Sequence, residues 1–304
     1  MAKTIGVVIS ERVLAGLVVD HQLAGPLHSF PEGEDDDASL VELHSDALIE
    51  AICQQIIAVK GKLTDVTAVG LAVPGVVRAG VVEDAPNLPQ LKGVRIAELL
   101  CIKLREHDLD CPVTVLNDAD GVASGLAAAQ GKLDRLMRVW TLGVGIGFGR
   151  YPFAEGVWEG GHTVVTLDEK ENYCGCGGRG HIEGIMGHRA MRLRFLDMEP
   201  EEVFAEAQNH ASSDHARCLD FVKLWHRALA AGCATSIHLD GPGKFFITGF
   251  NARFVDMVML KSNIAQMVKL SPLQSWQLEI VGDNPEMRII GSAVAAEQAA
   301  QARS

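Results

Sequence analysis

The sequence predicts an α/β fold in two domains, and three observations support this. The chain has 304 residues, enough for two domains of ordinary size with their own cores. Short apolar, β-branched runs alternate with longer segments in which apolar residues recur at helical spacing. Mixed strands joined by crossover helices are typical of layered α/β proteins, so we expect two similar halves with a cleft between them.

The first half of the chain begins with strands and ends with a helix. Residues 4–20 are apolar and β-branched around glycines, which predicts a hairpin or two buried strands. The expected elements that follow are an acidic turn over 32–37, a helix from Ser45, a strand over 66–73 ending in Pro74-Gly75, a strand over 113–116 and an alanine-rich helix over 119–129.

The second half has a different texture. A strand over 139–149 passes into a glycine loop, and an irregular, glycine-rich stretch continues to Gly180. Helices are then expected over 183–195, 214–239, 252–268 and 286–300, with single strands over 244–248 and 277–281. We therefore expect an N-terminal α/β domain of residues 1–117, completed by a C-terminal helix at about 288–304, and a second α/β domain of residues 118–287.

Composition and charge exclude several classes of function. Hydrophobic residues make up 48% and charged residues 22%, which is ordinary for a globular protein. The net charge of −12, with no lysine or arginine run, repels a phosphate backbone, so no nucleic-acid partner is expected. No apolar run approaches the roughly 20 residues that span a bilayer, and no secretory segment is recognised. We therefore expect a cytoplasmic protein without a membrane partner.

Four glycines alternate after the strand from residue 139, at Gly143, Gly145, Gly147 and Gly149. Their backbone N–H groups could bind an anion, because no Cβ prevents a close approach. A dinucleotide fingerprint would need glycine where Phe148 stands, and the phosphate-loop motif of nucleoside triphosphatases is absent. The alternative is a glycine-rich turn that binds no ligand.

Three of the residues that bind soft metal ions lie within eight positions, at Cys174, Cys176 and His181. The glycines between them let the chain fold around one ion, and zinc is the ion expected. A tetrahedral site needs a fourth ligand, for which His162 is the nearest candidate upstream. The spacing is less specific than paired C-x-x-C motifs, so an incidental loop of reduced thiols is the alternative. The other five of the seven cysteines are scattered and predict no disulfide framework.

Asn117 and Asp118 follow an expected strand and start an expected helix. An aspartate there could cap the helix, or it could act as a general base on a hydroxyl nucleophile. Residue chemistry alone leaves both roles open. Glu159, His162 and Glu183 are ambiguous in the same way, because glutamate is common on surfaces and a single histidine is more often structural.

Together these motifs resemble the ROK family of bacterial sugar kinases, repressors and related proteins, over almost the whole chain. The strongest element runs from Cys174 to Glu183 and is similar to the family's C-x-C-G-x-x-G-C-x-E, with His181 where a third cysteine is usual. The remaining matches are Val73-Pro74-Gly75, Pro86-Asn87-Leu88, Asn117-Asp118-Ala119, the glycine loop from Gly143, and Glu159-Gly160-Gly161-His162.

The resemblance implies an actin-like ATPase, ribonuclease H-like two-domain sugar kinase fold, and it implies a role for each matched residue. Asp118 would be the base on the accepting hydroxyl, and His162 would bind structural zinc together with Cys174, Cys176 and His181. Sugar hydroxyls would contact Asn87, Asn117, Asp118, Glu159, His162 and Glu183. Nucleotide contacts would come from Gly143, Gly145, Gly147 and Gly249. Dimers are common in the family, so we expect a homodimer.

The departures from the family pattern fall on its nucleotide motifs. The family's first phosphate loop, D-x-G-G-T, reads here Val8-Ile9-Ser10-Glu11-Arg12, so the magnesium-linked aspartate is a valine and both glycines are absent. Arg12 could bind an anion or occupy its place. Val144 replaces a threonine in the second loop, and Phe250 after Gly249 would crowd a nucleotide.

Phosphoryl transfer depends on metal and backbone donors, whereas a hexose site needs only converging polar groups. We therefore expect a hexose-binding protein of the sugar kinase type with weakened or lost ATP phosphotransfer, such as a sugar sensor. The alternative is an active, glucokinase-like sugar kinase that uses Mg-ATP, with Asp118 as the base. A repressor is disfavoured because the family's repressors carry an N-terminal winged helix, and here the first expected strand starts within a few residues of Met1.

Overall fold

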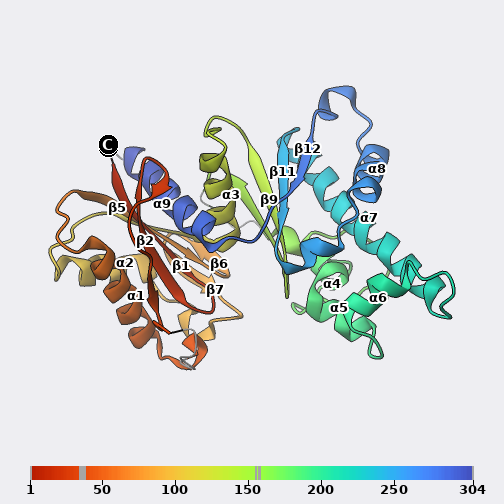
Figure 1. The fold of residues 1–304 in the computed structure, drawn as a ribbon, viewed down its shortest axis with the longest axis horizontal. Coiled ribbons are helices and arrows are strands. Elements are labelled where there is room, and N and C mark those ends of the chain that lie inside the picture. Colours follow the sequence, from red (N-terminus) through yellow and green to blue (C-terminus); the bar gives the residue numbers. More distant parts are fainter. Residues whose placement is uncertain (1, 34–38, 155, 157–158, 303–304) are drawn as a thin grey trace. The chain divides into compact units, whose positions relative to one another are not determined.

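The computed structural model describes residues 2–33, 39–154, 156 and 159–302, and it confirms the predicted α/β class (Figure 1). Contacts divide the chain into two compact units. Unit 1 comprises Met1–Met137, Gly149–Trp158 and Asn284–Ser304, and unit 2 comprises Arg138–Phe148 and Glu159–Asp283. Residues 34–37 of the expected acidic turn lie outside the described residues.

Unit 1 is built on a six-stranded sheet in which the order is β3-β2-β1-β5-β8 and β4 also pairs with β2. The predicted hairpin is present, because β1 and β2 are antiparallel, while β1, β5 and β8 run parallel to one another. The strands are β1 (Lys3–Ile9), β2 (Val13–Val19), β3 (Gln22–Leu23), β4 (His28–Phe30), β5 (Val66–Val73) and β8 (Val113–Asn117). Valine and isoleucine favour these extended segments.

The two faces of this sheet are packed in different ways. Ile5 and Val7 of β1 belong to an aliphatic core shared with α1 (Ser45–Lys60) and α2 (Ile96–Arg105). Strand side chains alternate between faces, so Gly6 and Gly70 lie on the opposite face, against α9 (Pro285–Gln301). A Cβ atom on Gly70 would lie 1.9 Å from the Ser292 carbonyl oxygen, so only glycine allows α9 to approach this closely.

Helix α3 (Asp118–Ala129) continues this close packing on α9. A Cβ atom on Gly125 would lie 1.9 Å from the Met287 carbonyl oxygen. Because of this contact, residues 118–137 fall in unit 1 together with α9, whereas the sequence analysis placed the boundary before Asp118. The sequence analysis also missed α2 and the small elements β6 (Val76–Arg78), β7 (Val81–Asp84) and η2 (Pro89–Leu91).

A four-stranded sheet in the order β10-β9-β11-β12 lies mostly in unit 2, while Met137 of β9 and residues 149–151 of β10 are assigned to unit 1. The strands are β9 (Met137–Leu142), β10 (Ile146–Tyr151), β11 (Lys244–Thr248) and β12 (Gln277–Ile280). The expected glycine loop is therefore confined to residues 143–145, and Gly147 and Gly149 lie in β10 instead. Pairing with β9 overrides the low strand propensity of glycine, and Gly149 is required because a Cβ atom would lie 2.0 Å from the Ala119 carbonyl oxygen.

The helices of unit 2 depart from the expected ranges at two points. The helix expected over 183–195 is interrupted at Gly187, where the next residue, His188, donates its N–H to the Gly143 carbonyl. The helix expected over 252–268 starts later, after the Asp256 carboxylate accepts the N–H groups of Val258 and Met259. The helical segments are α4 (Ile182–Met186), α5 (His188–Arg194), α6 (Pro200–Glu206), α7 (His215–Asp240), η4 (Phe250–Phe254) and α8 (Met257–Met267).

Large aromatic side chains fill the core of unit 2. The buried cluster includes Trp140, Phe195, Phe204, Phe221, Trp225 and Phe245.

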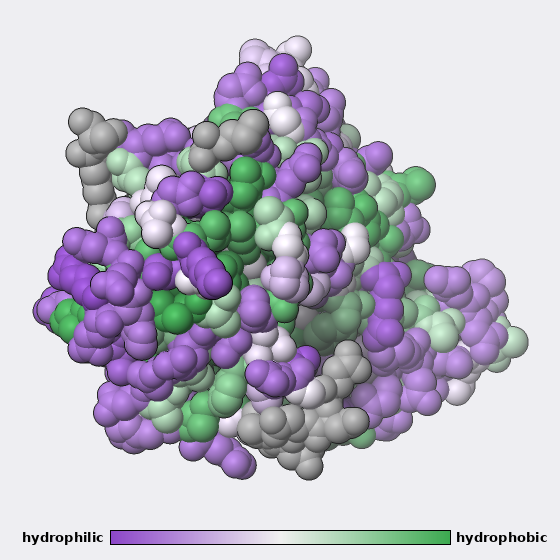
Figure 2. Space-filling view, turned by 60° about the vertical axis from the view of Figure 1, so that its left-hand side comes forward, coloured by the Kyte–Doolittle hydropathy of each residue, from purple (hydrophilic) through white to green (hydrophobic). Residues whose placement is uncertain are grey.

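At the surface, hydrophilic residues dominate the face drawn in Figure 2, and apolar residues are exposed among them in smaller groups. Within the described ranges, the helices are too short or too polar to cross a bilayer.

Candidate functional site

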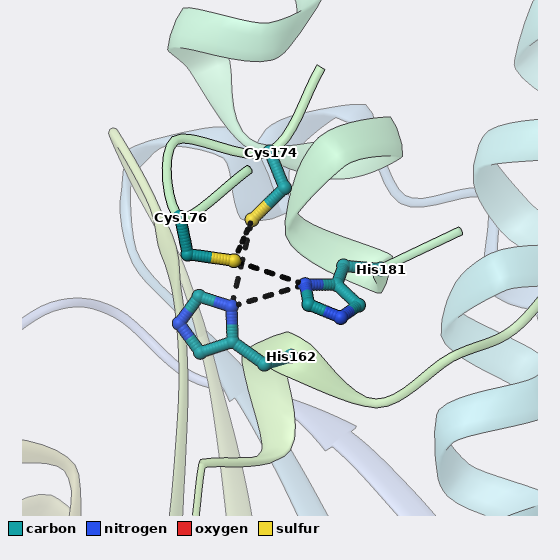
Figure 3. Close-up of side chains that lie close together, drawn as sticks. All are labelled: His162, Cys174, Cys176 and His181. Atoms are coloured by element: carbon teal, nitrogen blue, oxygen red, sulfur yellow. Dashed lines mark hydrogen bonds between the residues drawn. The ribbon is translucent and has the colours of Figure 1, made fainter. Parts of the chain in front are cut away.

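Four side chains with metal-binding atoms converge in unit 2 (Figure 3). His162 ends the short helix η3 (Gly160–His162), Cys174 and Cys176 lie in the loop after it, and His181 directly precedes α4. Cys174 Sγ lies 3.4 Å from Cys176 Sγ and 3.5 Å from His162 Nδ1. His181 Nδ1 lies 3.3 Å from both Cys176 Sγ and His162 Nδ1. These are the four residues that the sequence analysis assigned to one metal ion.

The cluster has the dimensions of a tetrahedral zinc site. Zinc binds nitrogen at about 2.0–2.1 Å and sulfur at about 2.3 Å, which places two nitrogen ligands about 3.3 Å apart and two sulfur ligands about 3.8 Å apart. The nitrogen pair lies at 3.3 Å and the sulfur pair at 3.4 Å, so a small separation of the thiols would admit the ion. Two thiolates and two imidazoles would neutralise Zn²⁺ and complete its four-ligand shell, as in structural sites.

Glycines allow the loop to bring these ligands together. A Cβ atom on Gly178 would lie 2.1 Å from Cε1 of His181, inside the ring's contact distance. Gly180 has a φ of +69°, and a Cβ atom there would lie 2.0 Å from the Thr166 carbonyl oxygen. The two arms of the loop are joined by hydrogen bonds from the Val165 N–H to the Gly180 carbonyl, 2.8 Å, and from the Ile182 N–H to the Thr163 carbonyl, 3.0 Å. His181 is thereby fixed beside His162.

Protonation of the ligands is coupled to the binding of a cation. Burial raises the pKa of the Cys174 thiol to about 12; the backbone N–H of Cys176 acts in the opposite direction, whereas the Cys176 thiol and the charge of Glu183 raise the pKa further. Burial, followed by the proximity of His162, lowers the pKa of His181 and so favours its neutral, metal-binding form. A bound divalent cation is what would convert these thiols to thiolates.

Two carboxylates, those of Glu159 and Glu183, lie next to this cluster in unit 2. Glu183 accepts the Ile146 N–H through Oε2 at 3.1 Å, and its Oε1 lies 3.5 Å from Cys174 Sγ. Glu159 Oε2 lies 3.7 Å from His162 Nε2, the ring nitrogen on the side away from the cluster. This distance is too long for a hydrogen bond, so the carboxylate lies beside the ring without fixing its tautomer. Of the expected sugar contacts, His162 therefore belongs to the metal cluster, and Glu159 and Glu183 lie beside it.

Two of the expected sugar contacts, Asn117 and Asp118, lie at the carboxyl end of β8. Asn117 caps α3, because its Oδ1 accepts the Ala119 N–H at 2.8 Å while its Nδ2 donates to the Gly75 carbonyl at 2.7 Å. The half-buried Asp118 is the first residue of α3, and its Oδ1 also accepts the Ala119 N–H. Asparagine thus fills the capping position proposed as the alternative role of the aspartate. Asn87 is exposed in the loop before η2.

The turn between β1 and β2 is held by its own chain. The Ser10 N–H donates to the Arg12 carbonyl at 3.0 Å, and the Val8 side chain before the turn is fully buried. The Arg12 guanidinium donates to the Ser29 hydroxyl at 2.9 Å and to the Pro31 carbonyl at 3.0 Å through Nε. Arg12 is therefore engaged by β4 and the residue after it, rather than directed to an anion as the sequence analysis allowed.

The two glycine elements expected to bind a nucleotide lie close together in unit 2. The Gly143 carbonyl accepts from the His188 N–H at 3.0 Å and from Nδ2 of Asn251 at 3.1 Å. The Phe250 ring lies edge-on to His188, with 5.2 Å between ring centroids, and its Cε1 would be 3.6 Å from a Cβ atom on Gly143. Gly249 adopts a φ of +92° immediately before it.

A cavity of about 380 Å³ lies beside this loop, lined by Val144, His188, Arg189, Arg192 and Leu193. The sequence analysis missed His188 and Asn251, because these residues reach Gly143 from 45 and 108 positions away along the chain. A glycine requirement also has a structural explanation at Gly145, where a Cβ atom would lie 2.5 Å from Glu183 Oε2.

Comparison with known proteins identifies a family. The ROK family model matches residues 41–284. A glucokinase of Pyrobaculum calidifontis is 28% identical over 200 residues, which is 61% of this chain and 62% of that protein, so the match spans less than two thirds of the relative.

Solved structures share the fold over nearly the full length. The ROK hexokinase from Thermus thermophilus superposes with a TM-score of 0.77 at 21% identity, covering 99% of both chains. A ROK family glucokinase from Streptomyces griseus, in complex with glucose and AMPPNP, superposes with a TM-score of 0.65 at 21% identity, covering 98% of this chain and 100% of that one. The sugar kinase fold expected from the sequence is thus confirmed.

Proposed function

This chain belongs to the ROK family, and on that premise we propose that it binds a hexose as the family's sugar kinases do, with weakened or lost phosphoryl transfer from ATP. The residues proposed to contact the sugar are the ones that match the family's motifs: Asn87, Asn117, Asp118, Glu159, His162 and Glu183. The amide, carboxylate and imidazole groups of these residues supply the donors and acceptors that sugar hydroxyls require. The names of the relatives, which include a glucokinase and a glucokinase with bound glucose, support a hexose as the ligand.

The β1–β2 turn is the observation that carries the proposal of weakened transfer. Kinases position and neutralise the transferred phosphoryl group with metal ions, backbone N–H groups and cations. At this turn Val8 presents a buried aliphatic side chain, Glu11 adds an exposed negative charge, and Arg12 is held by Ser29 and Pro31. The magnesium-linked aspartate is therefore replaced by a buried aliphatic side chain, Glu11 would repel a polyphosphate, and the Arg12 guanidinium is already bonded within the unit.

We further propose that His162, Cys174, Cys176 and His181 hold a structural zinc ion. When bound, zinc would supply a crosslink that closes the loop between η3 and α4. Beside the ion, Glu159 lies 3.7 Å from His162 Nε2, and Glu183 accepts the Ile146 N–H at the edge of the glycine loop. The loop would thereby present Glu159 and Glu183 to a sugar in fixed positions.

Calorimetry with a panel of hexoses, with and without Mg-ATP, tests the hexose proposal. We expect binding of at least one hexose, with an affinity that Mg-ATP leaves unchanged. A coupled assay with glucose, mannose, fructose and amino sugars is expected to show no sugar phosphate. Turnover in the usual enzyme range of about 1–1000 per second would contradict the loss of transfer.

An active sugar kinase is the second candidate, favoured by one observation. Asp118 is retained at the N-terminus of α3, where its carboxylate could accept a proton from a sugar hydroxyl. If the chain phosphorylates a sugar, Asp118→Asn is expected to lower kcat about 100-fold or more while leaving the hexose Kd nearly unchanged. Asp46→Asn, at an exposed position of α1, is the matched control and should leave kcat unchanged.

We also propose that the protein is a cytoplasmic homodimer, as the family resemblance suggests. Light scattering at twice the chain mass of 32.6 kDa would support the dimer, and a mass of 32.6 kDa at micromolar concentration would contradict it. Cell fractionation tests the location.

A further inference from the structure

A buried ion pair ties the metal-binding loop to the helices of unit 2. Glu171 lies in this loop, three residues before Cys174, and Arg194 is the last residue of α5. The Arg194 guanidinium donates to both carboxylate oxygens of Glu171, through Nη1 at 3.0 Å and through Nη2. The side chains are only 17% and 9% exposed, respectively. A bidentate, largely buried ion pair has a defined geometry that exposed ion pairs lack.

Aromatic rings hold the arginine of this pair in place. The guanidinium lies 4.4 Å from the centre of the Tyr173 ring and 5.3 Å from that of Phe221. Tyr173 belongs to the loop itself, between Glu171 and Cys174, whereas Phe221 belongs to α7 and to the buried aromatic core. Arg194 therefore contacts the loop twice and the core once.

The main chain of Glu171 is hydrogen-bonded to the other arm of the loop. Its carbonyl accepts the Gly180 N–H at 2.7 Å, directly before the ligand His181. A shift of Glu171 would thus displace Cys174 along the chain and His181 across it. We propose that the Glu171–Arg194 ion pair is a clamp that keeps the metal ligands assembled and thereby sets the metal affinity, an inference that rests on the zinc site of the proposed function.

The same loop contains a second ion pair that serves as a control. Arg179 lies between Cys176 and His181, and its Nη1 is 3.8 Å from Glu169 Oε2. These side chains are 63% and 88% exposed, so water competes for both charges and the pair fixes little. Arg179 is nearer than Arg194 to the metal ligands in sequence, yet the clamp predicts that only Arg194 affects the metal.

Competition against a chromophoric chelator measures the clamp in the full-length chain. The Kd for Zn²⁺ and for Co²⁺ is determined for the wild type, Glu171→Gln, Arg194→Gln, the double variant and Arg179→Gln. We expect each single clamp variant to raise Kd about 10- to 100-fold, as loss of supporting contacts around a metal site does. The double variant should be no worse than the singles, because both remove one interaction, and Arg179→Gln should stay within about twofold.

Two further readouts separate the clamp from a general loss of structure. In the chelated protein, hydrogen exchange at the Gly180 amide should be faster in the clamp variants than in the wild type, while exchange in α7 stays unchanged. If a glutamine variant does not fold, as judged by near-ultraviolet circular dichroism, Tyr173→Leu replaces it. This change removes only the ring beside the guanidinium and should raise Kd several-fold.

The outcomes distinguish the clamp from the metal site. Wild-type Co²⁺ binding with the intense absorption of thiolate ligation, together with unchanged Kd values in folded clamp variants, overturns the clamp alone. Absence of that absorption in the wild type overturns the zinc site and the clamp with it. An equal loss of affinity in Arg179→Gln also counts against the clamp, because an exposed charge would then matter as much as the buried pair.

Discussion

The two units of the molecule differ in the kind of internal contact that stabilises each of them. In unit 1, helix α9 lies so close to the sheet and to α3 that its carbonyl oxygens would meet a Cβ atom on Gly6, Gly70 or Gly125 at 1.9–2.0 Å. The opposite face of that sheet belongs to a largely aliphatic cluster shared with α1 and α2. Unit 2 instead surrounds α7 with tryptophan and phenylalanine side chains and carries the metal cluster.

The contrast shows that the units should respond to different perturbations. Unit 1 depends on the absence of side chains at a few backbone crossings, so added volume should damage it most. Unit 2 depends on large side chains, a buried ion pair and a proposed ion, so loss of metal or a change in protonation should damage it most. Each of the following predictions tests one side of this contrast.

The largest effect is expected for Gly70→Ala in unit 1. The new Cβ atom would lie 1.9 Å from the Ser292 carbonyl oxygen, so α9 must move away from β5. We expect the free energy of unfolding of unit 1 to fall by about 3 kcal/mol or more, at the upper end for overpacking. The loss is measured by urea unfolding, with hydrogen exchange of the β1 and β5 amides as the readout.

Gly282→Ala is the matched control for this substitution. A Cβ atom on Gly282 would meet no atom within 4 Å, so its effect should stay within about 0.5 kcal/mol. If Gly70→Ala lowers the free energy of unfolding no more than Gly282→Ala does, the close backbone packing at Gly70 is not what stabilises unit 1.

Metal removal should be the next largest effect, and it should be confined to unit 2. At free zinc about 100-fold above Kd, binding to the native state alone contributes about 2.7 kcal/mol of stability. A strong chelator should therefore lower the unfolding temperature of unit 2 and speed hydrogen exchange in the loop before α4. Exchange in β1 and β5 should not change. An equal change in both units would contradict the contrast between them.

Much of the fold could be predicted because its signals are local. The apolar, β-branched runs of β1, β2 and β5 and the helical period in α1 depend only on neighbours along the chain. The failures arise where distant contacts override local preference. Gly147 was expected in a loop and lies in β10, and the helix expected across Gly187 is broken where the chain turns to bond the Gly143 carbonyl.

The candidate site divides in the same way. The metal ligands could be predicted because three of them lie within eight residues and glycines separate them. The clamp could not, because Glu171 and Arg194 are 23 positions apart and each alone is an ordinary surface residue type. His188 was missed for a similar reason, since its contacts with Phe250 and Asn251 exist only in the folded chain.

A smaller effect, dependent on pH, is expected from His226 in α7 of unit 2. Its Nδ1 contacts the Val222 carbonyl at 2.8 Å and its Nε2 accepts the Asp256 N–H at 2.8 Å, so the buried ring must be neutral. Burial lowers its pKa, opposed by the Val222 bond and the Asp256 charge. The unfolded chain therefore binds a proton first as pH falls below about 6.5, and stability should fall by up to about 1.4 kcal/mol per pH unit until the native pKa is reached.

The measurement compares urea unfolding of the chelated protein at pH 7.5 and 5.5, so that pH-dependent metal binding does not contribute. His181, whose pKa burial also lowers, is present in the wild type and in the variant, so its effect cancels when the two proteins are compared. His226→Gln should be less stable at pH 7.5 but should lose less stability between the two values. An identical loss in the variant would show that His226 does not cause the pH dependence. Hydrogen exchange in β1 should show no matching change, since the group lies in unit 2.

The smallest effect is expected for Arg12. Its substitution tests whether the charged side chain at the β1–β2 turn of unit 1 stabilises the turn or binds phosphate. Arg12→Ala removes the hydrogen bonds to Ser29 and Pro31 and should lower the free energy of unfolding of unit 1 by about 1 kcal/mol. Arg78→Ala, at an exposed position of β6, should have no measurable effect. Calorimetry with Mg-ATP provides the decisive comparison. If the arginine only fastens the turn to β4, the heat of mixing is the same in both variants and the wild type. If Arg12→Ala alone weakens nucleotide binding, the guanidinium must leave Ser29 to meet phosphate, and the turn then takes part in donor binding after all.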